Sequence, residues 1–369
     1  MVFTKFKWIE WFSVIVMISL REEVVQRIRQ YLPGFYRFLK TEDGKRWLQE
    51  RHERLKEFSK LLAKDSLKEF TEADFVKVMS KLWANELWTN KQYPVERVLS
   101  SISIEDLKAR LSDLLWSNRP LSQRYDEFRK VVKGMGPAQI TEILSFINPH
   151  QYGIWNRRSR EALRALGLGD VVPVRKYDIS GSEYERFNAV LKNIAPILKS
   201  EEIPDPNLLD VDLFLYYVVA IAEKAKTIEV EPEEEFDHDE IKEMLLQIGQ
   251  GLGFEVDSEV PLAPGAKVDV VWRARIGNLG EVKYVFEVHK EGSVDSLLLN
   301  LFKAQSDPTV QKVIAVSNEK RLNIIRREAS GLPQLPDRLI YWTVAEVRRV
   351  ADLLGELKKI MEKLELVKL

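Results

Sequence analysis

The chain has no cysteine among its 369 residues. This absence excludes a disulfide framework, a cysteine-ligated zinc site and a thiol nucleophile, and it indicates an intracellular, cytoplasmic protein. An excess of one charge sign is also absent, because 56 Lys and Arg residues stand against 57 Asp and Glu residues. A nucleic-acid surface would therefore have to be a local patch. Abundant Lys, Glu and Arg without cysteine is also typical of a thermophile protein.

A run of apolar residues long enough to cross a bilayer is absent too. Residues 11–20 are apolar, but a spanning helix needs about 20 such residues. Lys5 and Lys7 precede this run as in a signal peptide, yet Arg21 and two glutamates follow it in place of a cleavage site. We expect no membrane partner. Met17 begins a regular amphipathic pattern, so residues 1–16 are an extension or a misassigned start; a docking segment and a membrane contact are the alternatives.

Changes in hydrophobic periodicity predict two domains. Residues 17–228 carry apolar side chains every three or four positions, which predicts a mostly α-helical N-terminal domain with a break at Pro33-Gly34 and at later prolines and glycines. Residues 229–237 form an acidic, proline-containing linker. Residues 238–369 mix strand-type alternation with helical segments and predict an α/β domain. The chain is long enough to build both cores.

Two acidic residues in neighbouring predicted strands carry the clearest chemical signal. Asp269 and Glu287, eighteen positions apart, both lie in alternating segments rich in β-branched and aromatic residues. Because side chains at i and i+2 share one face of a strand, we expect Glu287 and His289 to point one way while Phe286 and Val288 point into a core. Carboxylates hold hard cations such as Mg²⁺, and a neighbouring group then positions water for hydrolysis.

The predicted elements around these acids follow a definite order. They are a helix over 241–252, strands at 254–256, 267–272 and 284–289, a helix capped by Ser293, strands at 310–316 and 339–344, and a terminal helix. This α-β-β-β-α-β order with additional elements, together with the acid pair, resembles the PD-(D/E)xK, or restriction-endonuclease-like, nuclease superfamily. The resemblance covers residues 238–369, about a third of the chain.

The resemblance implies a catalytic site in which Asp269 and Glu287 bind Mg²⁺ or Mn²⁺. Superfamily members place a lysine two residues after the second acid, where it helps to activate water. His289 occupies that position here, so the resemblance departs from the family pattern at a catalytic residue. The alternative without a catalytic role is that Asp269 is a surface residue and that Glu287 and His289 are ordinary polar residues at the edge of a sheet.

Four further residues are candidates for auxiliary roles in such a site. Lys290 follows His289 but is expected on the opposite face of the strand. Some superfamily members supply the lysine from the following helix, where Lys303 lies. Many members also carry an additional acid on the first helix, for which Glu240 and Glu243 are candidates. A solvated helix face explains these two glutamates equally well.

A glycine-containing hairpin stands out in the helical part. Gly134 and Gly136 lie between two predicted helices, the second over residues 139–147. Closely spaced glycines permit a tight hairpin, whose backbone N–H groups and following helix N-terminus are suited to a DNA phosphate. This segment resembles the helix-hairpin-helix element of DNA glycosylases. A plain turn between two helices is the alternative.

The glycosylase resemblance fails at the catalytic positions. The family's aspartate, twenty residues beyond the second glycine, is Asn156 here, and the lysine nucleophile of bifunctional members corresponds to Ala138. A neutral amide cannot stabilise a cationic transition state as a carboxylate would. We therefore expect a DNA-binding scaffold without base excision, in which Asn156 caps its helix or contacts DNA. Arg157, Arg158 and Arg160 would form a basic patch on one side, or a solvated face.

The function predicted from the sequence is a Mg²⁺-dependent DNA endonuclease, a hydrolase of the restriction, defence or repair type. The helical domain would bind DNA, and a homodimer is compatible with this reading. The first alternative is a non-catalytic DNA-binding or damage-recognition protein with a degenerate nuclease site. The second is a protein-interaction module without a nucleic-acid role.

Overall fold

The computed structural model describes residues 20–88, 90–225, 236–263, 266–275, 280–332, 335 and 338–364. The expectations for residues 1–16 and for linker residues 229–235 lie outside these ranges. Among the residues that are described, no helix combines the length and the apolar character that a membrane span requires.

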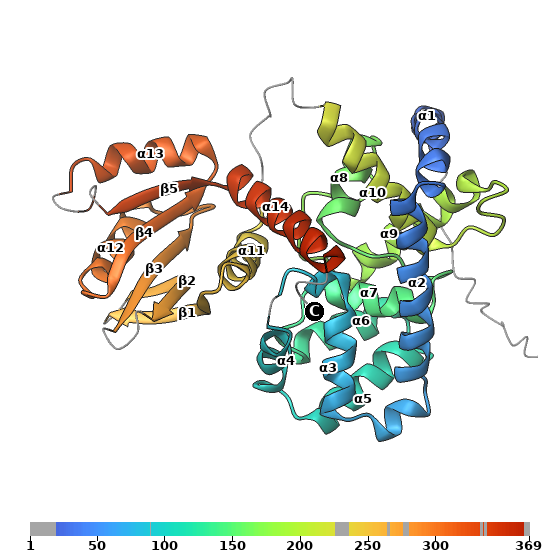
Figure 1. The fold of residues 1–369 in the computed structure, drawn as a ribbon, viewed down its shortest axis with the longest axis horizontal. Helices are drawn as coiled ribbons and strands as arrows, with labels where there is room; N and C mark the ends of the chain where they lie inside the picture. The colour runs from blue at the N-terminus through green and yellow to red at the C-terminus, as the bar shows by residue number, and fades with distance from the viewer. Residues whose placement is uncertain are drawn as a thin grey trace, which may run out of the picture.

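The N-terminal part is mostly α-helical, as the periodicity predicts. Three short 3₁₀ turns, η1 (Ser66–Glu69), η2 (Trp83–Asn85) and η3 (Ala195–Leu198), lie among its helices (Figure 1). The helices are α1 (Glu22–Leu39), α2 (Glu42–Leu61), α3 (Glu72–Lys81), α4 (Gln92–Leu99), α5 (Ile104–Trp116), α6 (Leu121–Val131), α7 (Pro137–Ile147), α8 (Arg157–Ala165), α9 (Gly181–Ile194) and α10 (Leu208–Ala225).

The break predicted at Pro33-Gly34 is wrong, because α1 continues through both residues. Proline inside a helix costs about 3 kcal/mol, but one large apolar side chain contributes about 1.5–3 kcal/mol when it is buried. The helix buries several on either side of the proline, so packing outweighs the lost backbone hydrogen bond. Gly34 allows Tyr217 to approach, since a Cβ there would lie 2.1 Å from the tyrosine Oη. The buried residues of α1 are Val24, Ile28, Phe35 and Leu39.

Helix α7 runs through the middle of this helical core. Its residues from Gln139 to Phe146 are all buried, so the helix is surrounded by protein on every side. It follows α6 directly, and residues 132–136 make the tight connection between the two helices. The glycine hairpin predicted from the sequence is therefore anchored to the most buried helix of the domain.

The C-terminal part is a five-stranded mixed sheet in the order β1-β2-β3-β4-β5. Strands β1 to β3 pair antiparallel, and β3, β4 and β5 pair parallel. The predicted order of elements is confirmed, although the first strand is longer than its three predicted residues. The elements are α11 (His238–Gly251), β1 (Glu255–Ala263), β2 (Ala266–Arg275), β3 (Glu281–Val288), α12 (Val294–Gln305), β4 (Val310–Ser317), α13 (Glu319–Ala329), β5 (Leu339–Thr343) and α14 (Val344–Lys363).

Helices cover both faces of the sheet. One core lies between the sheet and helices α11 and α14, and it includes Phe286 and Val288. The other lies between the sheet and helices α12 and α13, and it includes Val285. The expectation that Phe286 and Val288 point into a core is thus confirmed, and the strand alternation assigns Glu287 to the face covered by α12.

The two parts of the chain pack against each other. Trp88, from the helical part, is fully buried in the core beneath α11 and α14. The N–H of Asn90 donates to Gln250 Oε1 at 3.0 Å, and Lys358 on α14 donates to the carbonyl of Leu87. Helix α14 accordingly runs from the sheet towards the helical part (Figure 1).

Candidate metal site and nucleic-acid interface

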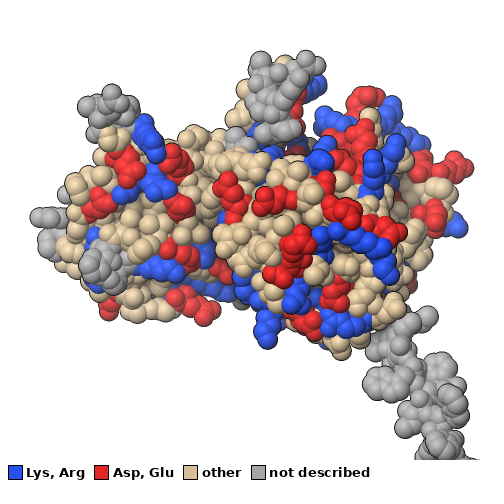
Figure 2. Space-filling model, turned by 90° about the horizontal axis from the view of Figure 1, so that it is seen from below, with Lys and Arg blue, Asp and Glu red and all other residues tan. Residues whose placement is uncertain are grey.

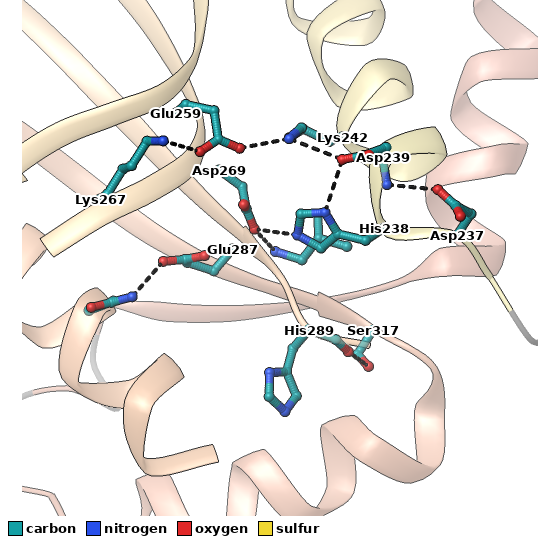
Figure 3. Close-up of polar contacts among 12 residues, drawn as sticks. Asp237, His238, Asp239, Lys242, Glu259, Lys267, Asp269, Glu287, His289 and Ser317 are labelled. Atoms are coloured by element: carbon teal, nitrogen blue, oxygen red, sulfur yellow. Dashed lines mark hydrogen bonds and ion pairs between the residues drawn. The ribbon is translucent and has the colours of Figure 1, made fainter. Parts of the chain in front are cut away.

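Asp269 and Glu287 meet across the two central antiparallel strands. Val270 and Phe286 form the last pair of the β2–β3 register, and Asp269 and Glu287 each lie one residue beyond it. The two carboxyl groups are within hydrogen-bonding reach of each other (Figure 3). Like charges directly opposite each other are unfavourable in a sheet. The pair therefore requires a proton or a cation between its oxygens.

Two donors hold the carboxylate of Asp269 in place. The N–H of Val288 donates to its Oδ2 at 2.8 Å, and Nε2 of His238 lies 3.1 Å from the same oxygen. Burial opposes ionisation, but the hydrogen bond and the charge of His238 hold the pKa of Asp269 below its usual value. Asp269 is thus the ionised member of the pair.

Glu287 has the opposite electrostatic environment. Its side chain is buried, and Asn300 Nδ2 donates to its Oε1 at 3.3 Å. Burial, followed by the nearby charge of Asp269, raises the pKa of Glu287 to about 9. The group therefore holds a proton at neutral pH in the metal-free protein.

The donor set fits a hard divalent cation with a partly hydrated shell. Within the described ranges, no group of three or more His, Asp or Glu residues converges on one point. Mg²⁺ commonly uses one or two carboxylates and keeps several waters, which matches Asp269 and Glu287. The chain has no cysteine for a softer metal. These two residues are therefore the candidate ligands for Mg²⁺ or Mn²⁺.

His289 lies just beyond the end of β3, and its ring points away from Asp269 and Glu287 (Figure 3). Its backbone N–H donates to the carbonyl of Val316 at 2.8 Å, and its own carbonyl accepts from Ser317 Oγ. Burial, with a smaller contribution from the charge of Arg321, lowers the pKa of His289. The residue at the family's lysine position is thus a neutral imidazole turned towards the β4–α13 side.

Three of the four auxiliary candidates lie away from the acid pair. Glu240 and Glu243 face the helical part, where they form ion pairs with Arg160 and Arg97 respectively, the latter at 2.7 Å. Lys290 is exposed in the turn after β3. Lys303 lies on α12, three residues after Asn300.

Two residues beside the acid pair were not predicted from the sequence. His238 is the first residue of α11, and Asn300 is a polar residue within the apolar run of α12. That interruption of an apolar run is a usable signal for Asn300. His238 has no comparable signal, because only the packing of α11 beside β2 places it next to Asp269.

The hairpin glycines are required by close packing. Gly134 has φ of 86°, and a Cβ on it would lie 3.0 Å from the carbonyl of Arg97. A Cβ on Gly136 would lie 2.6 Å from Tyr177 Oη. The N–H of Gly136 donates to Gln139 Oε1 at 2.7 Å, so this donor already has an acceptor within the protein. The exposed cations next to the hairpin are Lys130 and Lys133.

The three arginines of α8 do not form an open basic patch. Asn156 caps the helix by accepting from the N–H of Ser159 at 2.8 Å. Arg157 pairs with Asp352 and Arg160 with Glu240, both across the contact between the two parts. Arg158 lies over the ring of Tyr216 at 5.2 Å. Side chains predicted to contact phosphate are therefore engaged inside the protein.

The visible surface is of mixed charge. On the face shown in Figure 2, Lys and Arg side chains alternate with Asp and Glu over both parts of the molecule. This agrees with the net charge of −1. Comparison of the chain with protein-family models, with curated proteins and with solved structures found no match.

Proposed function

We propose that the chain is a Mg²⁺-dependent DNA endonuclease of the PD-(D/E)xK type, with a helix-hairpin-helix domain that binds DNA. The observation that carries the proposal is the buried acid pair of Asp269 and Glu287 across β2 and β3. Two facing carboxylates are costly in a sheet, and a divalent cation could offset this cost in place of the proton that Glu287 holds. The element order around the pair supports the same proposal.

The hairpin is linked to the start of α11 through Tyr177. Tyr177 lies against Gly136, and burial together with the charges of Glu243, Glu240 and Asp237 raises its pKa. These carboxylates belong to the start of α11 and the residue before it, next to His238.

Each residue of the proposed site would have its own role in phosphodiester hydrolysis. A bound Mg²⁺ ion would lower the pKa of a coordinated water and offset negative charge on the phosphate. Asp269 is already ionised and oriented, so it offers a carboxylate oxygen without rearrangement. Glu287 would have to give up its proton to serve as a ligand, and Asn300 donates a hydrogen bond to its Oε1. No lysine follows Glu287 at the family's position, so the rate is expected to be modest.

A non-catalytic DNA-binding protein with a degenerate site is the second candidate. The orientation of His289 favours it, because the residue at the lysine position is neutral and points away from the acid pair. A cation bound at Asp269 and Glu287 would then have a structural role. Cleavage separates the two candidates.

The test is cleavage of supercoiled plasmid, branched and single-stranded DNA by the purified chain in Mg²⁺ and in Mn²⁺. Asp269→Asn and Glu287→Gln are expected to abolish cleavage. Glu291→Gln is the matched control, since Glu291 is an exposed acid in the turn after β3. Cleavage that survives both site substitutions would indicate a contaminating nuclease. Absence of cleavage on every substrate would replace the proposal with the non-catalytic one.

A further inference from the structure

His238, the first residue of α11, contacts the acid pair through Asp269. It follows Asp237, whose carboxylate caps the helix by accepting from the N–H groups of Asp239 and Glu240. This cap fixes the first turn of α11 and hence the backbone of His238. The ring then lies between Asp239 and Asp269, with Nε2 3.1 Å from Asp269 Oδ2 (Figure 3).

The contact with His238 restrains the side chain of Asp269. Asp269 and Glu287 lie one residue beyond the last β2–β3 pair, Val270 and Phe286. If Glu287 gave up its proton to a cation, two carboxylates would repel each other here, and Asp269 would depend on its other contacts to keep its position. The ring of His238 and the N–H of Val288 both meet Oδ2, from a helix and from the neighbouring strand. Two contacts on one oxygen, made from two different elements, restrain the carboxylate of Asp269.

We propose that His238 is a positioning residue for the metal-binding carboxylate of Asp269. The proposal rests on the metal site proposed above. It assigns His238 no contact with the metal, because its ring nitrogen is already bonded to Oδ2. Hydrogen bonds of this kind to a metal-bound carboxylate orient the ligand, and their loss typically weakens metal affinity by about 10–100-fold.

The test is Mn²⁺ binding to the full chain without DNA, measured by titration calorimetry. His238→Ala is expected to weaken binding by at least about tenfold. His238→Gln carries an amide N–H at nearly the position of Nε2, so it is expected to recover most of the affinity. His52→Ala is the matched control, because His52 is exposed on α2, in the other part of the molecule. His238→Leu, which retains bulk without a donor, repeats the comparison if the alanine variant is less stable.

Each outcome has a defined meaning. Unchanged Mn²⁺ affinity in His238→Ala, with binding lost in Asp269→Asn, would overturn the positioning role and keep the metal site. Equal losses in His238→Ala and His238→Gln would also overturn it, because a hydrogen bond would then not be the relevant property. Unchanged affinity in Asp269→Asn would overturn the metal site and this inference together. None of these measurements depends on cleavage.

Discussion

Arg160 and Glu240 form a buried ion pair that joins α8 of the helical part to α11 of the sheet part. Their side chains are only 8% and 5% exposed. Arg348 Nη2 lies 3.9 Å from the second oxygen of Glu240. Because α11 also carries His238, this pair anchors the helix that reaches the acid pair. The ion pair thus adds to the contacts that join the two parts of the chain.

Removing one partner of this pair is predicted to destabilise the protein. Arg160→Met leaves the Glu240 carboxylate buried with a distant partner, at a cost of about 3–5 kcal/mol in the free energy of unfolding. The double variant Arg160→Met/Glu240→Leu should recover most of this loss. Urea denaturation of the full chain measures the free energy of unfolding of the single and the double variant. Lys45→Met is the control, since its exposed pair with Glu42 should change stability by less than about 1 kcal/mol. A small effect of Arg160→Met would show that the two parts separate easily.

The buried carboxyl of Glu142 predicts a pH dependence of stability. It accepts hydrogen bonds from the N–H groups of Trp83 and Ala84 at 2.6 and 2.9 Å, but burial raises its pKa from 4.5 to about 7. Between these values the folded protein holds a proton that the unfolded chain releases. The free energy of unfolding should therefore fall by roughly 3 kcal/mol from this group as the pH rises through that window.

The variant Glu142→Gln isolates this contribution. It should lower stability at acidic pH, because the amide cannot accept from both N–H groups. It should also flatten the decline of stability towards pH 7. Denaturant unfolding at several pH values provides the measurement. A slope equal to that of the wild type would mean that Glu142 does not titrate in this range.

Substitutions at the acid pair and at His289 should have unequal effects on cleavage. Asp269→Ala and Glu287→Ala each remove half of the anionic ligand set, so cleavage should fall below detection while DNA binding persists. His289→Ala should reduce the rate less than His238→Ala, because the ring of His289 points away from the pair. Initial rates measured over a range of Mg²⁺ concentrations, including limiting ones, provide the comparison. A larger effect at His289 would require that ring to turn towards the substrate.

DNA binding should depend on the hairpin rather than on α8. Lys130→Gln/Lys133→Gln should weaken binding across sequences and reduce the salt slope by about 2, because exposed lysines act through phosphates. Gly136→Val should also weaken binding, since its side chain would collide with Tyr177 and open the hairpin. Fluorescence anisotropy with labelled duplexes at several salt concentrations measures both.

The matched control for the hairpin is Lys64→Gln, an exposed lysine after α2. If Lys64→Gln also reduced the dependence of DNA affinity on salt concentration, the effect of the lysine substitutions would reflect net charge alone. Full binding by the double lysine variant would exclude the hairpin as the contact.

Local pattern was sufficient to predict the order of elements. Strand alternation identified β2 and β3, and it placed Phe286 and Val288 in a core and Glu287 on the other face. The expectation that a proline ends a helix failed at Pro33, because packing on both sides of the proline stabilises α1. Sequence reasoning handles such cases poorly because the stabilising contacts, such as Tyr217 against Gly34, come from far along the chain.

The sequence by itself determined the helical and sheet parts and the spacing of Asp269 and Glu287, because hydrophobic periodicity and strand pairing between neighbours are local properties. Only the tertiary structure decided which charges meet. Arg160 and Glu240 were expected at DNA and at the metal, yet they lie 80 positions apart and bind each other. His238 reaches Asp269 only because α11 packs beside β2. Ion pairs and hydrogen bonds depend on distances of a few ångströms between distant segments, and no periodicity encodes those distances.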